Sequence, residues 1–287
     1  MDFVRNPFNY VASKDRLLAD ITGRLDYTKN RFFDLFCGSG VVSVNVGDKY
    51  EHIIMNDGCP QMIDLLSYMR EHTVEELLCE ADKYRSMFHL SKTNKEGYLK
   101  AREYYNKGNK NPMLLYMLIT HAFSYNVVFN SRGGFSVPSG VNRSYFNPTL
   151  RNKFINFCNK LKEIHDIQFM QLKLNELVNC SKEWVWEDVM VYVDPPYSTS
   201  DASCSRSYGL KWTKEHDKIL MNFLDYISDK GASFMMSNAF KNNGYKNEEL
   251  IAWSEKYNTE HLACDYNNCH HLRKNAGDTD EVIIYNY

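Results

Sequence analysis

The sequence has no apolar run that approaches the roughly 18 residues of a membrane-spanning helix. Its first residues, MDFVRNPFNYVASKDRLL, lack a basic stretch followed by an apolar core, so no secretory leader is indicated. Its eight cysteines show no paired spacing, which favours reduced thiols over a disulfide framework. These absences predict a cytoplasmic protein that does not enter a membrane.

Metal-binding spacings are also scarce. One cluster, at Cys264, Cys269, His270 and His271, could bind zinc, but its single Cys-x4-Cys spacing has no second pair. We therefore expect no metal site.

The net charge of −2 hides a strong segregation of charge. Between Lys83 and Glu163 there are 14 basic residues and 3 acidic ones, whereas the rest of the chain has 20 basic and 33 acidic residues. A basic segment inside an acidic protein predicts a surface that binds phosphates, and a solvated helical surface is the alternative.

The first third of the chain alternates strand and helix signals. Strands are expected at Arg31–Phe36 and at His52–Asn56, which ends next to Asp57. Between them, VVSVNVG opens a short helix after the glycine-rich turn CGSG, and a helix from about Pro60 to Arg70 starts with a well-placed proline. This order is typical of the first half of a doubly wound nucleotide-binding sheet.

The pattern then becomes helical from about Thr73 to Phe123, followed by a turn-rich stretch from Ser131 to Pro148. Sheet and helix signals resume after it: strands at Ile167–Leu174 and Val189–Val193, a helix at Lys214–Ser228, a strand at Ala232–Met236, a helix at Asn247–Lys256, and strands near Glu260–Cys264 and Glu281–Tyr285. We predict an α/β fold, a Rossmann-like sheet interrupted by an inserted, mostly helical domain.

The turn DLFCGSG suits a cofactor that must approach the backbone closely, because glycine permits both the turn and the contact. Asp57 follows at the end of the next strand, where an acid accepts hydrogen bonds from ribose hydroxyls; a helix cap is the alternative. The chain has neither G-x-G-x-x-G nor a P-loop, which disfavours nicotinamide cofactors and ATP. S-adenosylmethionine, which carries ribose and adenine without phosphates, fits better.

The strand Val189–Val193 ends at Asp194-Pro195-Pro196-Tyr197, where two prolines force the chain to turn. A plain strand-ending turn is one interpretation. The other is an active site in which the carboxylate and a proline carbonyl accept both N–H groups of an adenine amine. That arrangement directs the nitrogen lone pair at a methyl sulfonium while Tyr197 stacks on the base. A base in a duplex must first be flipped out.

With these motifs in hand, the chain resembles the Dam family (D12 class, α-group) of DNA adenine-N6 methyltransferases, and most of all the short enzymes of T-even bacteriophages. The matching segments are NYVASKDRLL, FFDLFCGSG, MND, FNSRGGFSVPSG, VYVDPPY, SNAFKNNG and GDTDEVIIYN. The resemblance implies methyl transfer from S-adenosylmethionine to adenine N6 in double-stranded DNA within GATC, in a bacterial or phage-infected cytoplasm.

The resemblance also implies that the chain has two domains with different roles. Residues 1–58 and 164–287 would form the catalytic domain, and residues 59–163 the target-recognition domain. The implied catalytic residues are Asp194, Pro195, Pro196 and Tyr197, and the cofactor-binding residues are Tyr10, Lys14, Asp34, Phe36, Gly38, Gly40, Asp57 and Asp194. The implied DNA-binding residues are Asn130, Arg132, Ser136, Pro138 and Arg143.

Four positions depart from the family pattern: Ala12 replaces a common glycine, Gln171 an acid, Val128 an arginine and Ser139 a phenylalanine. Two alternative functions stay open, an adenine methyltransferase that acts on RNA and a non-catalytic DNA-binding decoy against restriction. Core packing for Tyr10, a surface role for Lys14 and bracing of the Gly133-Gly134 turn by Arg132 are the structural alternatives. The oligomeric state is not indicated by the sequence.

Overall fold

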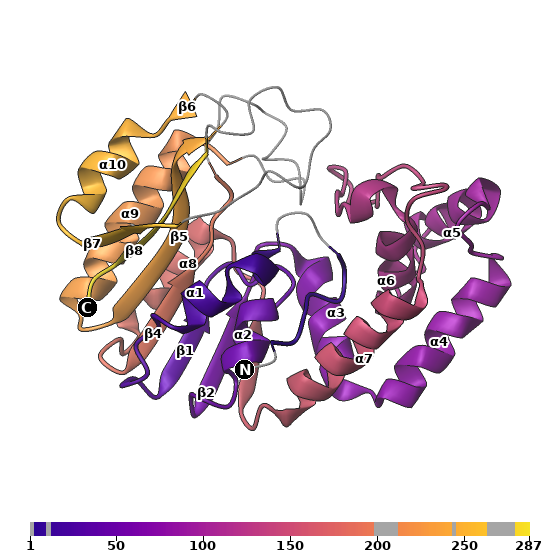
Figure 1. Cartoon of the computed structure of the whole chain (residues 1–287), viewed down its shortest axis with the longest axis horizontal. Helices are drawn as coiled ribbons and strands as arrows, with labels where there is room; N and C mark the ends of the chain where they lie inside the picture. The colour runs from indigo at the N-terminus through magenta and orange to yellow at the C-terminus, as the bar shows by residue number, and fades with distance from the viewer. Residues whose placement is uncertain (1–2, 10–12, 198–211, 243–244, 263–278) are drawn as a thin grey trace.

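The computed structural model describes residues 3–9, 13–197, 212–242, 245–262 and 279–287. The strands of this part of the chain form one mixed sheet in the order β3-β2-β1-β4-β5-β8-β7, with β6 paired to β5 (Figure 1). They are β1 (Arg31–Asp34), β2 (His52–Asn56), β3 (Ile167–Met170), β4 (Val189–Val193), β5 (Ser233–Asn242), β6 (Tyr245–Lys246), β7 (Asn258–His261) and β8 (Asp280–Tyr285). The predicted Rossmann-like α/β architecture is confirmed.

The strands β3, β2, β1, β4 and β5 run parallel, and β8 lies antiparallel between β5 and β7. The strand order reverses at β1, because β2 lies on one side of it and β4 on the other. Open parallel sheets bind ligands outside the carboxyl ends of the strands at such a reversal. The fold therefore places the glycine turn after β1 and the Asp-Pro-Pro-Tyr turn after β4 at the same edge.

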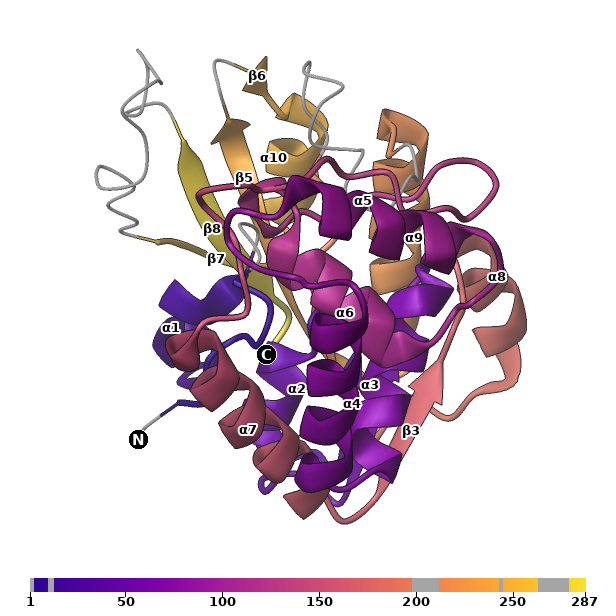
Figure 2. The same ribbon diagram turned by 90° about the vertical axis from the view of Figure 1, so that its right-hand side faces the viewer.

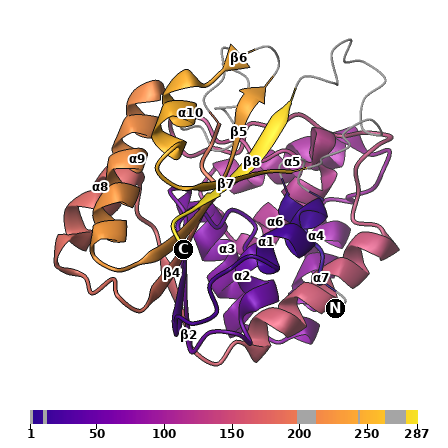
Figure 3. The same ribbon diagram turned by 60° about the vertical axis from the view of Figure 1, so that its left-hand side comes forward.

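Helices cover both faces of the sheet, as the views of Figures 1 and 3 show. On one face lie α1 (Leu18–Thr22), α2 (Val41–Val46) and α3 (Pro60–Glu71), and on the other α8 (Leu174–Cys180), α9 (Lys214–Asp229) and α10 (Glu248–Ser254). Strand β4 is buried throughout and serves both faces. Its Val191 packs on the side of α8 and α9, whereas Met190 and Tyr192 pack on the side of α1 and α2.

Between β2 and β3 the chain forms α3, α4 (Val74–Met87), α5 (Lys95–Asn106), α6 (Pro112–His121) and α7 (Pro148–Glu163). Figure 2 shows α4 to α7 in front of the sheet. Helix α6 is buried on all sides, which explains why its sequence is apolar all round. Side-chain caps start the helices, with Thr73 closing a capping box on α4 and Asn94, Asn111 and Asn147 capping α5, α6 and α7.

Several predicted strands have different bounds in the structure. Strand β1 ends at Asp34 and not at Phe36, and β5 runs from Ser233 to Asn242 and does not end at Met236. The strand expected to reach Leu174 ends at Met170, because the side chain of Asn56 binds the backbone of Leu172 and draws the chain out of the ladder. The strand expected near Glu260–Cys264 is β7, which begins at Asn258 and ends at His261 in register with β8.

Helices α1, α7 and α8 were not predicted from the sequence. Helix α7 carries a recognisable signal, since Asn147 and Pro148 start it and Leu150, Phe154 and Leu161 are buried at helical spacing. The short helices α1 and α8 have too few turns to show a period.

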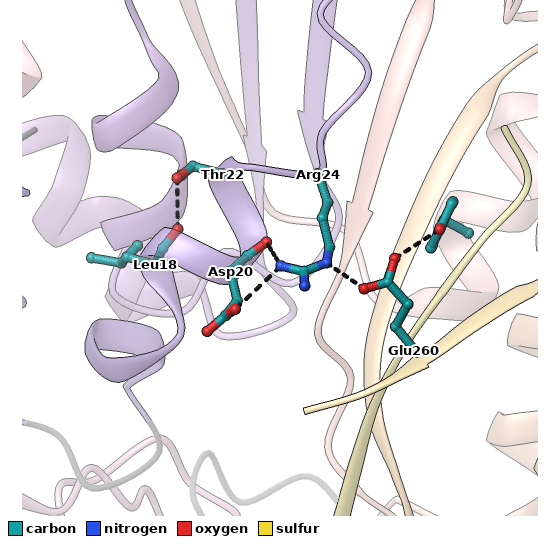
Figure 4. Close-up of polar contacts among 6 residues, drawn as sticks. Leu18, Asp20, Thr22, Arg24 and Glu260 are labelled. Carbon is teal, nitrogen blue, oxygen red and sulfur yellow. Dashed lines mark hydrogen bonds and ion pairs between the residues drawn. The ribbon is translucent and has the colours of Figure 1, made fainter. Parts of the chain in front are cut away.

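The first helix is fixed to the far end of the sheet through Arg24 (Figure 4). Its guanidinium donates to Glu260 on β7 at 2.7 Å and to the backbone oxygen and carboxylate of Asp20 at 2.8 and 3.2 Å. Glu260 in turn accepts from the Tyr285 hydroxyl. Among the described residues, no helix is both long and apolar enough to cross a membrane.

Candidate active site

The glycine turn after β1 has the backbone that its sequence predicts. Gly38 and Gly40 adopt φ angles of 51° and 73°, in the left-handed region that favours glycine. A Cβ on Gly40 would also overlap the Met55 side chain. Gly40 is the N-cap residue of α2, so the turn leaves bare backbone at the carboxyl edge of the sheet.

Asp57 joins this turn to the next one. Its carboxylate accepts the Gly38 N–H at 2.9 Å and the Cys59 N–H at 2.8 Å, and Cys59 is the N-cap residue of α3. Burial raises the pKa of Asp57 to about 6, with both N–H groups opposing that rise, so the group is ionised at neutral pH. Asp57 therefore has the bracing role that a turn aspartate would have, and it still offers free lone pairs to a ligand.

Asp34 ends β1 just below the glycine turn and is almost fully buried. One carboxyl oxygen accepts the Ser43 hydroxyl from α2 at 2.6 Å. Burial raises its pKa to about 8, and the charges of Asp194 and Asp57 add to the rise. Asp34 is thus mainly protonated at neutral pH in the free protein.

The Asp194-Pro195-Pro196-Tyr197 turn meets Lys14 from the first 3-10 turn of the chain, Lys14–Arg16. The Lys14 Nζ lies 2.9 Å from Asp194 Oδ1 and donates to the Tyr197 hydroxyl at 2.9 Å. The side chains of Lys14 and Asp194 are only 13% and 19% exposed, so solvent screens the pair weakly. Pro195 is buried, while Pro196 and Tyr197 are half-buried.

Electrostatics keep this cluster in a defined protonation state. Burial would lower the pKa of Lys14, but Asp194 and Tyr197 raise it well above its ordinary value. Burial raises the pKa of Tyr197 to about 12, so its hydroxyl stays neutral. Burial also raises the pKa of Asp194, and the Lys14 ammonium opposes that rise by favouring the carboxylate. The cluster holds a charged pair beside a fixed aromatic ring.

The remaining predicted cofactor residues lie around the same edge or cannot be placed. Phe36 is half-buried and packs edge-on against Trp212, with ring centroids 5.5 Å apart. Tyr10 lies outside the described residues, as do Cys264, Cys269, His270 and His271. Within the described part of the chain, no group of three His, Cys, Asp or Glu side chains could hold a metal ion.

The five predicted DNA-binding residues all lie exposed on the loop between α6 and α7, namely Asn130, Arg132, Ser136, Pro138 and Arg143. Asn130 braces the turn, since its side-chain oxygen accepts the N–H groups of Arg132 and Gly134, both at 2.9 Å. The Arg132 side chain makes no hydrogen bond to any residue that the structure describes. The bracing considered for Arg132 thus belongs to Asn130.

Two features of the loop between α6 and α7 and one feature at the end of β3 were not predicted from the sequence. Phe123 is 42% exposed at the start of the loop, with the Arg143 guanidinium 5.7 Å from its ring centroid. Its neighbours Ser124 and Tyr125 have φ angles of 53° and 55°, which non-glycine residues rarely adopt. The sequence does not indicate this exposure, because Phe123 comes almost directly after the apolar helix α6 and matches its apolar pattern.

Just after the end of β3, the side chain of Gln171 donates to the Asp64 carboxylate of α3 at 2.6 Å. Gln171 stands where the family often has an acid, and helix α3 supplies an acid beside it. This pairing depends on the packing of α3 against β3, which the sequence alone does not reveal.

Comparison with known proteins identifies the family. The family described as D12 class N6 adenine-specific DNA methyltransferase matches residues 10–261. The chain is 34% identical to the type II methyltransferase M.FokI of Planomicrobium okeanokoites over 287 residues, which is 99% of this chain and 43% of that protein. It is 31% identical to the modification methylase StsI of Streptococcus sanguinis over 290 residues, again 99% and 43%.

The chain thus spans less than half the length of these two relatives. Among solved structures, the rRNA methyltransferase AviRa of Streptomyces viridochromogenes aligns with 99% of this chain and 88% of its own. Its TM-score of 0.41 and identity of 11% carry no argument about substrate. The family match covers most of the chain, including the glycine turn and the Asp-Pro-Pro-Tyr turn. The chain therefore belongs to the D12 class of N6 adenine-specific DNA methyltransferases.

Proposed function

We propose that the chain transfers a methyl group from S-adenosylmethionine to N6 of an adenine in double-stranded DNA. The observation that carries this proposal is the Lys14–Asp194–Tyr197 cluster, which lies at the same sheet edge as the glycine turn and Asp57. The cluster offers a carboxylate and an aromatic ring to the target base, and the neighbouring turns offer backbone and a carboxylate to a nucleoside.

The order of the parallel strands, β3-β2-β1-β4-β5, suggests how the methyl donor would lie across their carboxyl ends. Asp57 on β2 would bind the ribose hydroxyls, and the turn Gly38-Ser39-Gly40 after β1 would lie along the donor. Met170 and Gln171 at the end of β3 would border the adenine. S-adenosylmethionine supplies an activated methyl sulfonium, so the protein has to position and polarise rather than form a covalent intermediate.

Asp194 and the Pro195 carbonyl would accept the two N–H groups of the target amine. This would localise the nitrogen lone pair and direct it at the methyl group, so that an N–C bond forms as the S–C bond breaks. S-Adenosylhomocysteine would leave as a neutral thioether, and the methylated nitrogen, now positively charged, would release one proton to solvent water. Lys14 would hold Asp194 in its charged form and fix the Tyr197 ring, on which the target base would stack.

We further propose that residues 59–163 form the target-recognition domain and residues 1–58 and 164–287 the catalytic domain. The excess of basic residues from Lys83 to Glu163 would contact phosphates. The Arg132 guanidinium, which makes no hydrogen bond to the part of the chain that the structure describes, would read a base. Asp194 and Tyr197 are both half-buried. An adenine in a duplex would therefore have to be flipped out of the helix to reach them.

The target sequence that the family resemblance predicts is GATC, in the cytoplasm of a bacterium or of a phage-infected host. The curated relatives described above are named as methylases of bacteria, so the narrower likeness to T-even phage enzymes stays a proposal. Val128 and Ser139 occupy two recognition positions where the family often has other residues. The test should therefore score every adenine context and not GATC alone.

The experiment is to express the chain in cells that lack adenine methylation and to sequence the modified bases of their DNA. N6-methyladenine in one sequence context supports the proposal, and the same cells with Asp194→Ala give the matched control. Methylation of RNA but not DNA would favour the RNA alternative. DNA binding without methyl transfer by the purified chain would favour the decoy.

A further inference from the structure

Three buried polar atoms have no hydrogen-bond partner among the described residues and lie near the catalytic edge. They are Oδ1 of Asp34, Oη of Tyr192 and Oγ of Ser237. Each of these residues is only 1% exposed. Buried polar groups in native proteins are nearly always hydrogen-bonded, so orphaned atoms at a functional edge point to a missing ligand.

The sheet register brings the three side chains together. Asp34 on β1 is paired with Tyr192 on β4, and Tyr192 with Met235 on β5, two residues before Ser237. Side chains two residues apart on a strand share a face. All three therefore point to the face of α1 and α2, on a line that crosses β1 and β4 near their carboxyl ends and β5 in its middle.

The surroundings of the Tyr192 hydroxyl link this line to the catalytic cluster. Burial raises the pKa of Tyr192 well above its ordinary value, the charges of Asp194 and Asp34 add to the rise, and Lys14 opposes it. The hydroxyl thus lies within the electrostatic reach of Asp194, Lys14 and Asp34. Nothing in the transfer step described above uses it.

We infer that Tyr192 and Ser237, together with Asp34, hold the amino-acid end of the methyl donor, its α-ammonium and α-carboxylate groups. This inference rests on the proposed function. In the proposed pose the ribose binds Asp57 after β2 and the sulfonium faces Asp194 after β4. The amino-acid end is then the part of the donor that would lie over β1, β4 and β5. A hydroxyl can donate to a carboxylate or accept from an ammonium. The Asp34 carboxyl, protonated in the free protein, can donate to the carboxylate, and it can accept from the ammonium once that cation favours its ionised form.

The test compares two ligands that differ only at this end. S-Adenosylhomocysteine has the amino-acid group, and 5′-methylthioadenosine has the nucleoside and sulfur without it. Calorimetry on the purified chain should show that Tyr192→Phe and Ser237→Ala each weaken S-adenosylhomocysteine binding by about 10-fold or more, the usual effect of losing a hydrogen bond to a charged group. Binding of 5′-methylthioadenosine should stay unchanged.

A structural role for the hydroxyls would give a different result. Because Tyr192 Oη and Ser237 Oγ have no partner among the described residues, both variants should keep or raise the melting temperature of the free protein. Tyr50→Phe is the matched control, since its hydroxyl bonds the Asp26 carbonyl at 3.2 Å near the opposite edge of the sheet. It should leave the binding of both ligands as in the wild type.

Two outcomes would overturn the inference: equal losses for the two ligands, or unchanged binding of S-adenosylhomocysteine. If the unmodified chain binds neither ligand, the proposed function fails instead, and the inference fails with it.

Discussion

The ammonium of Lys14 and the carboxylate of Asp194 lie 2.9 Å apart, although they come from the beginning of the chain and from the end of β4. Lys14 also donates to the Tyr197 hydroxyl, so one cation fixes both the acid and the aromatic ring of the Asp-Pro-Pro-Tyr turn. The pair is buried enough that losing either partner would leave an uncompensated charge. The first 3-10 turn is thus part of the candidate active site.

The first prediction concerns Asp194. Asp194→Ala should lower the rate of methyl transfer by roughly 100-fold or more, because it removes an acceptor for the target amine. Single-turnover assays with labelled S-adenosylmethionine measure this rate, and DNA affinity should fall much less than turnover. Wild-type turnover in the variant would exclude the catalytic role.

The second prediction concerns Asp57. If the ribose contact is real, Asp57→Ala should weaken cofactor binding by about 1.5–3 kcal/mol, the range for hydrogen bonds to charged groups. The variant should also unfold at lower temperature, because the N–H groups of Gly38 and Cys59 lose their acceptor. Asp57→Asn keeps one acceptor oxygen and serves as the milder control. Unchanged affinity with reduced stability would leave Asp57 a purely structural aspartate.

The third prediction is a pH dependence that comes from Asp34. Its pKa is raised from 3.8 to about 8 in the folded protein, so the folded state holds a proton that the unfolded chain has released. Its stabilising contribution is complete below about pH 3.8 and is lost as the pH rises through about 8. The slope is at most about 1.4 kcal/mol per pH unit.

Denaturant titrations of the free protein at a series of pH values test this dependence. Asp57 contributes with the same sign only up to about pH 6, so the window from 6 to 8 isolates Asp34 among these acids. The difference between the wild type and Asp34→Asn removes the contribution of the histidines. Parallel stability curves for the two proteins over that window would show that Asp34 is ionised in the folded state.

Much of the fold could be predicted from the sequence because several elements are specified locally. The strands His52–Asn56 and Val189–Val193 have the predicted bounds, since short β-branched and apolar runs end at an acid or at proline. The end of β3 could not be predicted, because it depends on the Asn56 side chain reaching Leu172 from another strand. Local sequence signals therefore predict that a helix or strand is present, whereas tertiary contacts decide the residue at which it ends.

The same division applies to the candidate site. Asp194 to Tyr197 could be found because the motif is contiguous and its chemistry can be derived from four residues. The orphaned hydroxyl of Tyr192 could not, because a tyrosine inside a buried strand has the same pattern whether or not its hydroxyl has a partner. Asn130 also needed the structure, which shows its side chain engaged within the turn and leaves Arg132 as the base-reading candidate.

The last prediction separates base reading from phosphate contact in the basic segment. A base-reading arginine can form two hydrogen bonds to guanine, worth about 1–3 kcal/mol of discrimination. Arg132→Ala should therefore compress the ratio of affinities for cognate and single-mismatch duplexes. Binding titrations on matched duplexes measure that ratio. A loss by the same factor on every sequence would exclude base reading by Arg132.

A lysine beside the loop provides the control. Lys153 is unsuitable, because its ammonium donates to Asn9 at 2.7 Å. Lys92 is exposed, and its backbone oxygen accepts the Asn142 N–H at 2.7 Å, which places it beside Arg143. Lys92→Ala should weaken binding to all duplexes alike and should make the log–log salt dependence shallower by about 0.9 for one lost phosphate contact. An unchanged salt slope would move the phosphate-binding surface away from this side of the loop.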